Sequence, residues 1–272
     1  MAMVLLGVLC AGASANFILQ SISVTIEAQK NGDAHIVEKI SMFLDSQDSV
    51  DLYKSSLGIS DIASWRSRIG LSDIRFHVST AEVGIVNLRI KPQPVERCST
   101  FDGTCWATMI LDYTATPLYN KTERINTTGV FFLEQGRPRT TRYSINPQAI
   151  SLKRTDSGDI LLDPYVTLTI IIPSDSVVES LQPIPSDLAD TVQPPFKGVS
   201  TFTWKNAILP KFELVFTRED TLESEIIQFF NNYSNRLTSF FLGPEGLALV
   251  VIILVVVASY VYLNTVEKKH KA

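Results

Sequence analysis

The sequence is poor in the residues and motifs by which enzymes are usually recognised. Only three histidines occur in 272 residues: His35, His77 and His270. The chain contains no G-x-S-x-G, H-E-x-x-H, G-x-x-x-x-G-K-[S/T] or G-x-G-x-x-G motif, the motifs that form nucleophile elbows, zinc sites and phosphate-binding loops. We therefore expect no catalytic residue and no cofactor. Paired carboxylates converge only in space, so a membrane-anchored enzyme with an unrecognised site remains an alternative.

Charge is also scarce. Charged residues make up 19% of the chain, and the formal net charge is −4. An acidic chain is poorly suited to nucleic acid, which we do not expect among its partners. The 14 Phe, 8 Tyr and 3 Trp supply enough apolar bulk for a packed core, and this excludes a chain that is disordered throughout.

The first 15 residues contain no charged side chain. An apolar run is followed by Ala13-Ser14-Ala15, the A-x-A pattern of a secretory signal, which predicts a signal peptide over residues 1–15. The alternative is an uncleaved anchor. However, 15 helical residues reach only about 22 Å, less than the roughly 30 Å of the hydrocarbon core.

A second uncharged segment covers residues 246–266. As a helix it would be about 31 Å long, which predicts one transmembrane span. Lys268, Lys269 and Lys271 follow it, and basic residues stay on the cytoplasmic side. The sequence therefore predicts a single-pass type I protein in the lipid bilayer. Its N-terminal bulk would be extracellular or luminal, and residues 267–272 would form a cytoplasmic tail.

Cysteine usage agrees with this topology. Cys10 would leave with the signal, and the remaining Cys98 and Cys105 bracket CSTFDGTC, in which Asp102-Gly103 favours a tight turn. In an oxidising compartment this spacing predicts a disulfide. A closed zinc site needs four ligands, so two cysteines do not indicate a metal.

Three N-x-[S/T] sequons lie on the predicted outer side, at Asn120, Asn126 and Asn232. Such sequons are acceptors for N-linked glycans in secreted proteins. Asn120 and Asn126 share a polar stretch that is typical of a loop. We therefore expect a glycoprotein.

Alternation of apolar and polar residues predicts strands through most of the chain. The strands at 21–28 and 34–44 would be joined by a type I′ hairpin turn at Lys30-Asn31-Gly32-Asp33. Short helical patterns cover 50–57 and 59–69. Further strands are expected at 74–78, 83–90, 107–115, 130–133, 142–145 and 165–173. Segments 201–204 and 212–216 would form a closing strand pair, after an irregular, proline-rich connection over 173–195.

Three groups of polar residues in this region are candidate sites. Glu38 lies on the apolar face of its predicted strand, which indicates a functional carboxylate, a residue near a sheet edge or a residue paired with a neighbouring base. Asp45, Asp48 and Asp51 lack the alternate spacing of a calcium loop, so helix capping or a solvated face is favoured. Arg137, Arg139 and Arg142 could contact an anion or a lipid headgroup, but a solvated loop is favoured.

An amphipathic helix is predicted over residues 219–243, next to the membrane. Aromatic residues recur on its apolar side, and these are the predicted membrane-interface residues: Phe229, Phe230, Tyr233, Phe240 and Phe241. The alternatives are a helix that binds a partner helix or one that packs under the β-rich region.

The stretch I-x-V-T-I-x-x-x-x-N-G-D-A-x-I-V-E-K-I, which begins at Ile22, resembles the start of prokaryotic, often archaeal, predicted type I membrane proteins of unknown function. The resemblance implies a signal, a β-rich outer region and a C-terminal span. It implies no functional residue.

The sequence thus predicts a mainly β protein with a β-sandwich-like ectodomain of one or two units, at 16–159 and 160–218, and a short helical insert. We expect a non-catalytic binding or scaffolding role, with other membrane or surface proteins as partners, as in an accessory subunit of a membrane complex. A cell-surface adhesion or recognition protein is the alternative.

Overall fold

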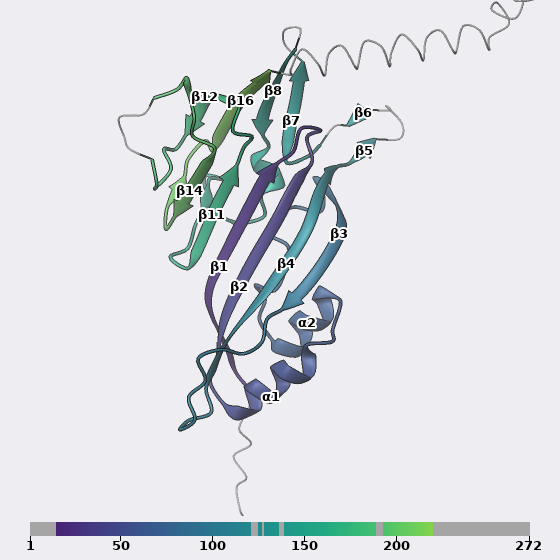
Figure 1. Cartoon of the computed structure of the whole chain (residues 1–272), viewed down its shortest axis with the longest axis vertical. Helices are drawn as coiled ribbons and strands as arrows, with labels where there is room; N and C mark the ends of the chain where they lie inside the picture. Colours follow the sequence, from purple (N-terminus) through teal and green to yellow (C-terminus); the bar gives the residue numbers. More distant parts are fainter. Residues whose placement is uncertain (1–14, 121–124, 127, 136–138, 189–192, 220–272) are drawn as a thin grey trace, which may run out of the picture. The chain divides into compact units, whose positions relative to one another are not determined.

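The computed structural model describes residues 15–219, apart from 121–124, 127, 136–138 and 189–192 (Figure 1). This part of the chain belongs to a single compact unit that ends at Glu219. It is mainly β, with 49% of the residues in strands, and two α-helices lie between the second and third strands. The predicted mainly β class and the helical insert are confirmed.

A six-stranded sheet contains the longest strands of the protein. Its order is β14-β11-β1-β2-β4-β3. The strands are β1 (Phe17–Ala28), β2 (Ala34–Leu44), β3 (Val83–Pro92), β4 (Cys105–Pro117), β11 (Val166–Ile171) and β14 (Thr201–Lys205). In β2 and β4 every second residue is buried, so the sequence alternation corresponds to one face in the core and one facing away from it.

A five-stranded sheet has the order β13-β12-β16-β8-β7. Its strands are β7 (Phe131–Gln135), β8 (Thr140–Ile145), β12 (Val177–Gln182), β13 (Phe196–Lys197) and β16 (Glu213–Glu219). A three-stranded sheet contains β9 (Lys153–Arg154), β10 (Ile160–Leu161) and β15 (Ile208–Leu209). A two-stranded sheet contains β5 (Tyr119–Asn120) and β6 (Ile125–Asn126).

Two short helices, α1 (Gln47–Ser56) and α2 (Ile62–Ile69), follow β2. The side chains of Ser46 and Asp61 cap their N-termini, and each accepts a hydrogen bond from a backbone N–H of the first turn. Gly70, at φ +76°, ends α2 in the left-handed conformation. The one 3₁₀ helix described is η1 (Pro147–Ala149).

The helices are fixed to the core by aromatic side chains. Tyr53 and Trp65 are both fully buried and in ring contact, with centroids 5.6 Å apart. The Tyr53 hydroxyl donates to the carbonyl oxygen of Gln93 at 2.8 Å, and the Trp65 indole N–H donates to that of Ile59 at 2.9 Å. Burial of such rings contributes about 2–3 kcal/mol each, and their polar atoms keep partners.

The two large sheets contribute to a single hydrophobic core. The Tyr143 hydroxyl of β8 donates to the carbonyl oxygen of Lys30, in the turn between β1 and β2, at 2.8 Å. A side chain at Gly32 in the same turn would overlap Leu133 of β7. The β1–β2 turn is therefore packed against the five-stranded sheet.

Strands from both halves of the chain share the six-stranded sheet. β11 pairs in parallel with β1, from Ile22 opposite Val166 to Glu27 opposite Ile171. The sequence left one or two units open. The expected boundary between 159 and 160 falls inside the one compact unit, because β11 and β14 complete a sheet begun by β1.

Several local expectations need correction. The turn between β1 and β2 is not type I′: the amide of Gly32 donates to the carbonyl of Gln29, and only Gly32 has a positive φ. This matches a three-residue loop with glycine at its left-handed position. The expected pair 201–204 and 212–216 does not form, since β14 pairs with β11 whereas β16 pairs with β12 and β8.

Two other segments also differ from expectation. The connection over 173–195 contains strand β12, which sequence analysis missed because prolines flank it. Segment 74–78 forms no regular strand, and its pairing is the single bridge of Val78 with Ile150.

Within residues 15–219 no helix is long and apolar enough to cross a membrane. The predicted signal up to residue 14, the amphipathic helix beyond Glu219, the span 246–266 and the tail 267–272 lie outside the described residues. These expectations remain predictions.

Candidate functional site

The most deeply buried ionisable cluster is centred on Glu38 of β2. The exposed fraction of Glu38 is 0%, and that of His77 is 1%. The carboxylate accepts hydrogen bonds from the His77 backbone N–H at 2.9 Å and from His77 Nδ1 at 2.7 Å. It also accepts one from the hydroxyl of Tyr113 of β4. Glu38 is thus paired with a base, one of the three interpretations that the sequence left open.

The chain around His77 is irregular and needs this anchor. The carbonyl oxygen of His77 accepts from the amide of Ser151 at 2.9 Å, and Phe76 packs edge-on against Tyr113, with ring centroids 5.1 Å apart. Burial and the negative charge of Glu38 both raise the pKa of Tyr113 far above its ordinary value of 10.0. Tyr113 therefore acts as a neutral donor.

The geometry of this cluster favours a structural role. Three donors occupy the two oxygens of Glu38, and neither Glu38 nor His77 is open to solvent. A general acid or base has to come within hydrogen-bond distance of its substrate, which a sealed carboxylate does not do. The cluster instead fastens the segment before β3 to the six-stranded sheet.

On the opposite face of the same sheet, charged residues line up across four strands. His35 Nε2 lies 2.9 Å from an oxygen of Asp112, and His35 Nδ1 lies 3.5 Å from Glu27. Lys91 Nζ contacts the second oxygen of Asp112 at 2.5 Å. The hydrogen bond to Asp112 is the main cause that raises the pKa of His35, and Lys91 and His35 lower the pKa of Asp112.

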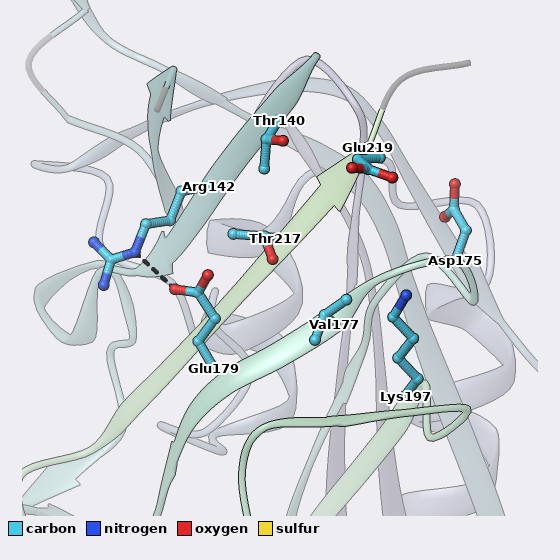
Figure 2. Close-up of a pocket in the computed structure, with 8 residues that line it drawn as sticks. All are labelled: Thr140, Arg142, Asp175, Val177, Glu179, Lys197, Thr217 and Glu219. Atoms are coloured by element: carbon cyan, nitrogen blue, oxygen red, sulfur yellow. Dashed lines mark hydrogen bonds and ion pairs between the residues drawn. The ribbon is translucent and has the colours of Figure 1, made fainter. Parts of the chain in front are cut away.

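The five-stranded sheet carries a groove of about 420 Å³ (Figure 2). Strands β8, β12, β13 and β16 supply most of its walls. The lining residues are Thr140, Arg142, Asp175, Val177, Glu179, Lys197, Thr217 and Glu219. Arg142 bonds to Glu179 at 3.1 Å on one side, whereas Lys197 rises beside Val177 on the other.

The groove is polar and of mixed charge. Three carboxylates face two cations, and Asp175 is held by both oxygens against the guanidinium Nε of Arg218, at 2.9 and 3.1 Å. Pockets for apolar small molecules are lined mainly by hydrophobic side chains, so this groove suits a small polar ligand. Sequence analysis missed it because its residues come from four strands that are distant in the chain.

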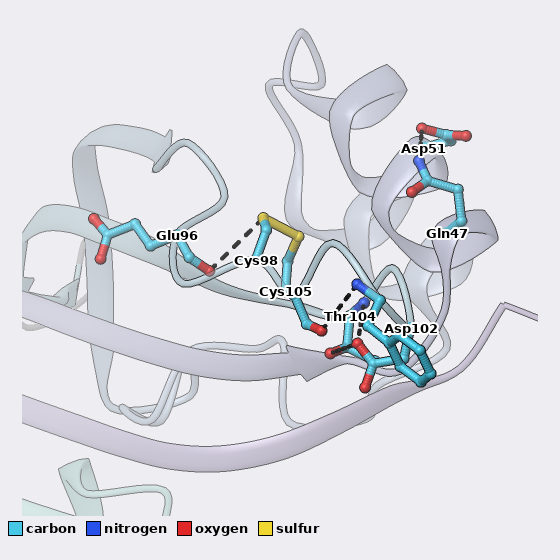
Figure 3. The surroundings of a disulfide bond; sticks show 9 residues. Gln47, Asp51, Glu96, Cys98, Asp102, Thr104 and Cys105 are labelled. Atoms are coloured by element: carbon cyan, nitrogen blue, oxygen red, sulfur yellow. Dashed lines mark hydrogen bonds between the residues drawn. A yellow bond between two sulfur atoms is a disulfide. The ribbon is translucent and has the colours of Figure 1, made fainter.

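The predicted disulfide is present. Cys98 and Cys105 are bonded, and their Cα atoms are 4.1 Å apart (Figure 3). Inside the closed loop the amide of Ser99 donates to the carbonyl of Thr104 at 2.8 Å. The Asp102 carboxylate accepts from the Thr104 hydroxyl at 3.0 Å, and side-chain hydrogen bonds with Ser99 and Thr104 lower its pKa. The turn spans five residues, because the amide of Gly103 donates to the carbonyl of Ser99 at 3.1 Å, and it is wider than the tight turn expected at Asp102-Gly103. This turn and the covalent bond together fix the loop, and closure contributes about 2–3 kcal/mol.

The predicted glycosylation sites lie in different parts of the chain. Asn120 lies in β5 and Asn126 in β6, and Asn126 is opposite Tyr119. Asn120 and Asn126 therefore lie in two short paired strands rather than in the expected loop. Asn232 lies outside the described residues, as do the predicted interface residues Phe229, Phe230, Tyr233, Phe240 and Phe241.

The remaining polar groups are accounted for by local bonds. Asp45 accepts from the Asn16 amide at 2.9 Å, and Asp51 accepts from Gln47 at 2.9 Å, which agrees with a solvated helix start. Arg142 pairs with Glu134 and Glu179, and Arg137 is outside the described residues. No group of three potential metal ligands occurs among the described residues.

Comparison with models of known protein families and with curated proteins finds no match to this chain.

The buried cluster predicts a graded loss of stability. Glu38→Gln leaves the donors of His77 and Tyr113 facing an amide that cannot accept them all, so we expect a loss of about 2–4 kcal/mol. Tyr113→Phe removes one donor and should cost about 1–2 kcal/mol. Urea unfolding measures both, with Glu213→Gln, an exposed residue of β16, as the control. Equal stability of Glu38→Gln and the control would contradict the structural role.

The ion pairs that His35 forms with Glu27 and Asp112, on the opposite face of the six-stranded sheet, predict that stability depends on pH. The pKa of folded His35 is raised above 6.5, so its stabilising contribution is complete below pH 6.5 and is lost as the pH rises through the folded-state pKa. Urea unfolding of His35→Asn should therefore differ from wild type most at mildly acidic pH and least at alkaline pH. A difference that grows towards alkaline pH would refute this assignment.

Proposed function

We propose that this chain is a single-pass type I membrane glycoprotein whose outer part binds or scaffolds other membrane or surface proteins without catalysis. In this proposal the two large sheets form a β-sandwich-like ectodomain, residues 219–243 form a membrane-proximal helix, and residues 246–266 cross the bilayer. An accessory subunit of a membrane complex is the version that we favour.

The observation that carries the proposal is the Cys98–Cys105 disulfide on an exposed loop. Disulfides persist in oxidising compartments and are rare in the cytosol, so this bond supports an outer or luminal location for the described unit. The apolar N-terminal segment and the uncharged segment 246–266, which three lysines follow, call for the same orientation.

The non-catalytic role is supported by the state of the ionisable groups. Glu38 is bonded to His77 and Tyr113 in the core, and the ion pairs among Glu27, His35 and Asp112 lie on an open sheet face. Enzymes usually place perturbed groups in a cleft. The groove of the five-stranded sheet is polar and lined by ion pairs, which suits binding.

The topology is tested in sealed membrane vesicles from the native host, with an epitope tag after residue 272. Alkaline carbonate should leave the full-length chain in the membrane, and a variant without residues 246–266 should be released. Protease added to the outer side should digest the described unit and spare the tag. Release of the intact chain by carbonate, or digestion of the tag alone, would refute the proposal.

The same vesicles test the glycans. Treatment with a glycosidase should increase the gel mobility of the wild-type chain, and Asn120→Gln/Asn126→Gln should reduce that change. Mobility unaffected by the enzyme in the wild type would show that the glycoprotein part of the proposal is wrong.

A further inference from the structure

The disulfide-closed loop presents one large apolar side chain to solvent. Phe101 is 100% exposed, at the tip of the turn between Cys98 and Cys105. A Cβ at Gly103 would lie 3.3 Å from that of Gln47, so the loop rests against the start of α1. The disulfide and this contact hold the backbone, which means that Phe101 is presented on a constrained loop.

A row of apolar side chains begins at the base of this loop. Ile18 is opposite Phe43, and Phe43 is opposite Trp106, the residue after Cys105. Their neighbours Phe17, Leu44 and Cys105 are buried, so the row lies on the uncovered face of the six-stranded sheet. Phe43 and Trp106 are in edge contact, with ring centroids 5.6 Å apart.

We call Ile18, Phe43, Phe101 and Trp106 the loop patch. Single apolar side chains on a surface are ordinary, whereas several together with polar surroundings are typical of protein interfaces. Aromatic residues at the centre of a patch supply most of the binding energy of such interfaces. A constrained loop also loses little entropy on binding.

The surroundings of the loop patch are acidic. Asp48 and Asp51 of α1, Glu96 and Asp102 are all exposed, and Figure 3 shows Asp51, Glu96 and Asp102 around the disulfide. Arg97, next to Cys98, is exposed as well, but the four carboxylates outnumber this guanidinium. Hydrogen bonds from Ser99 and Thr104 lower the pKa of Asp102 and keep it charged. An anionic membrane surface would be repelled by these charges, whereas a protein pocket with basic residues at its rim would be attracted.

The loop patch lies far from Glu219, the residue at which the described chain ends. The loop is at the Leu44 end of β2, and the turn at Lys30 precedes the other end of this strand. The Tyr143 hydroxyl of β8 donates to the carbonyl of Lys30 in that turn. Glu219, where the described chain ends, is opposite Thr140 of the same strand β8, so the chain ends near the turn. The 11 residues of β2 separate the two ends by about 33 Å (Figure 1).

We propose that the loop patch is the binding site for a protein partner that receives Phe101 in an apolar pocket with a basic rim. This inference rests on the proposed binding function and names its surface and the chemistry of its partner.

The experiment uses the full-length chain, purified in mild detergent from membranes of the native host. Wild type is compared with Phe101→Ser and with Phe132→Ser, since Phe132 is exposed on β7 of the other sheet. A protein that co-purifies with wild type is identified, purified and titrated against all three chains. We expect Phe101→Ser to weaken its binding by at least about 30-fold, as for an aromatic anchor, and Phe132→Ser to leave binding unchanged.

Binding should also weaken as salt is added, because the acidic residues around the loop patch would face the basic rim of the partner's pocket. If Phe101→Ser still bound the partner as tightly as wild type, the loop patch would not be the binding site, but the proposed binding function would stand. Absence of any co-purifying protein with wild type would overturn both. The inference would also be overturned if the only species whose binding depends on Phe101 were a second copy of this chain or anionic phospholipid vesicles.

Discussion

The parallel pairing of β1 with β11 is the contact on which the rest of the structure depends. Parallel strands cannot be joined by a tight turn, and here more than a hundred residues separate Ile22 from its partner Val166. This pairing brings both halves of the chain into one sheet. It also extends the buried face that Glu38 shares with its apolar neighbours, and it fixes which face of the sheet stays uncovered.

The consequences reach both ends of the described unit. At one end the β1–β2 turn packs on the five-stranded sheet, whose last strand leads out of the unit at Glu219. At the other end the loop closed by Cys98 and Cys105 continues from β4.

Local patterns were sufficient to predict much of this fold, and distant pairings were not. Alternation identified β1, β2 and β4, and the spacing of Cys98 and Cys105 identified the disulfide, because both signals lie within a few residues of sequence. The partner of Glu38 could not be predicted, since His77 lies in an irregular segment that only the tertiary structure brings to β2. The groove was missed for the same reason. β14 and β16 were wrongly paired because two adjacent strands usually pair.

The most direct test of this account is hydrogen exchange of the full-length chain, followed by mass spectrometry at increasing denaturant concentration. If β1 and β11 belong to one cooperative sheet, peptides that cover Phe17–Ala28 and Val166–Ile171 should lose protection at the same concentration, because neither can open without the other. Loss of protection in 160–219 at a clearly lower concentration than in 16–159 would contradict the single sheet and restore two independent units.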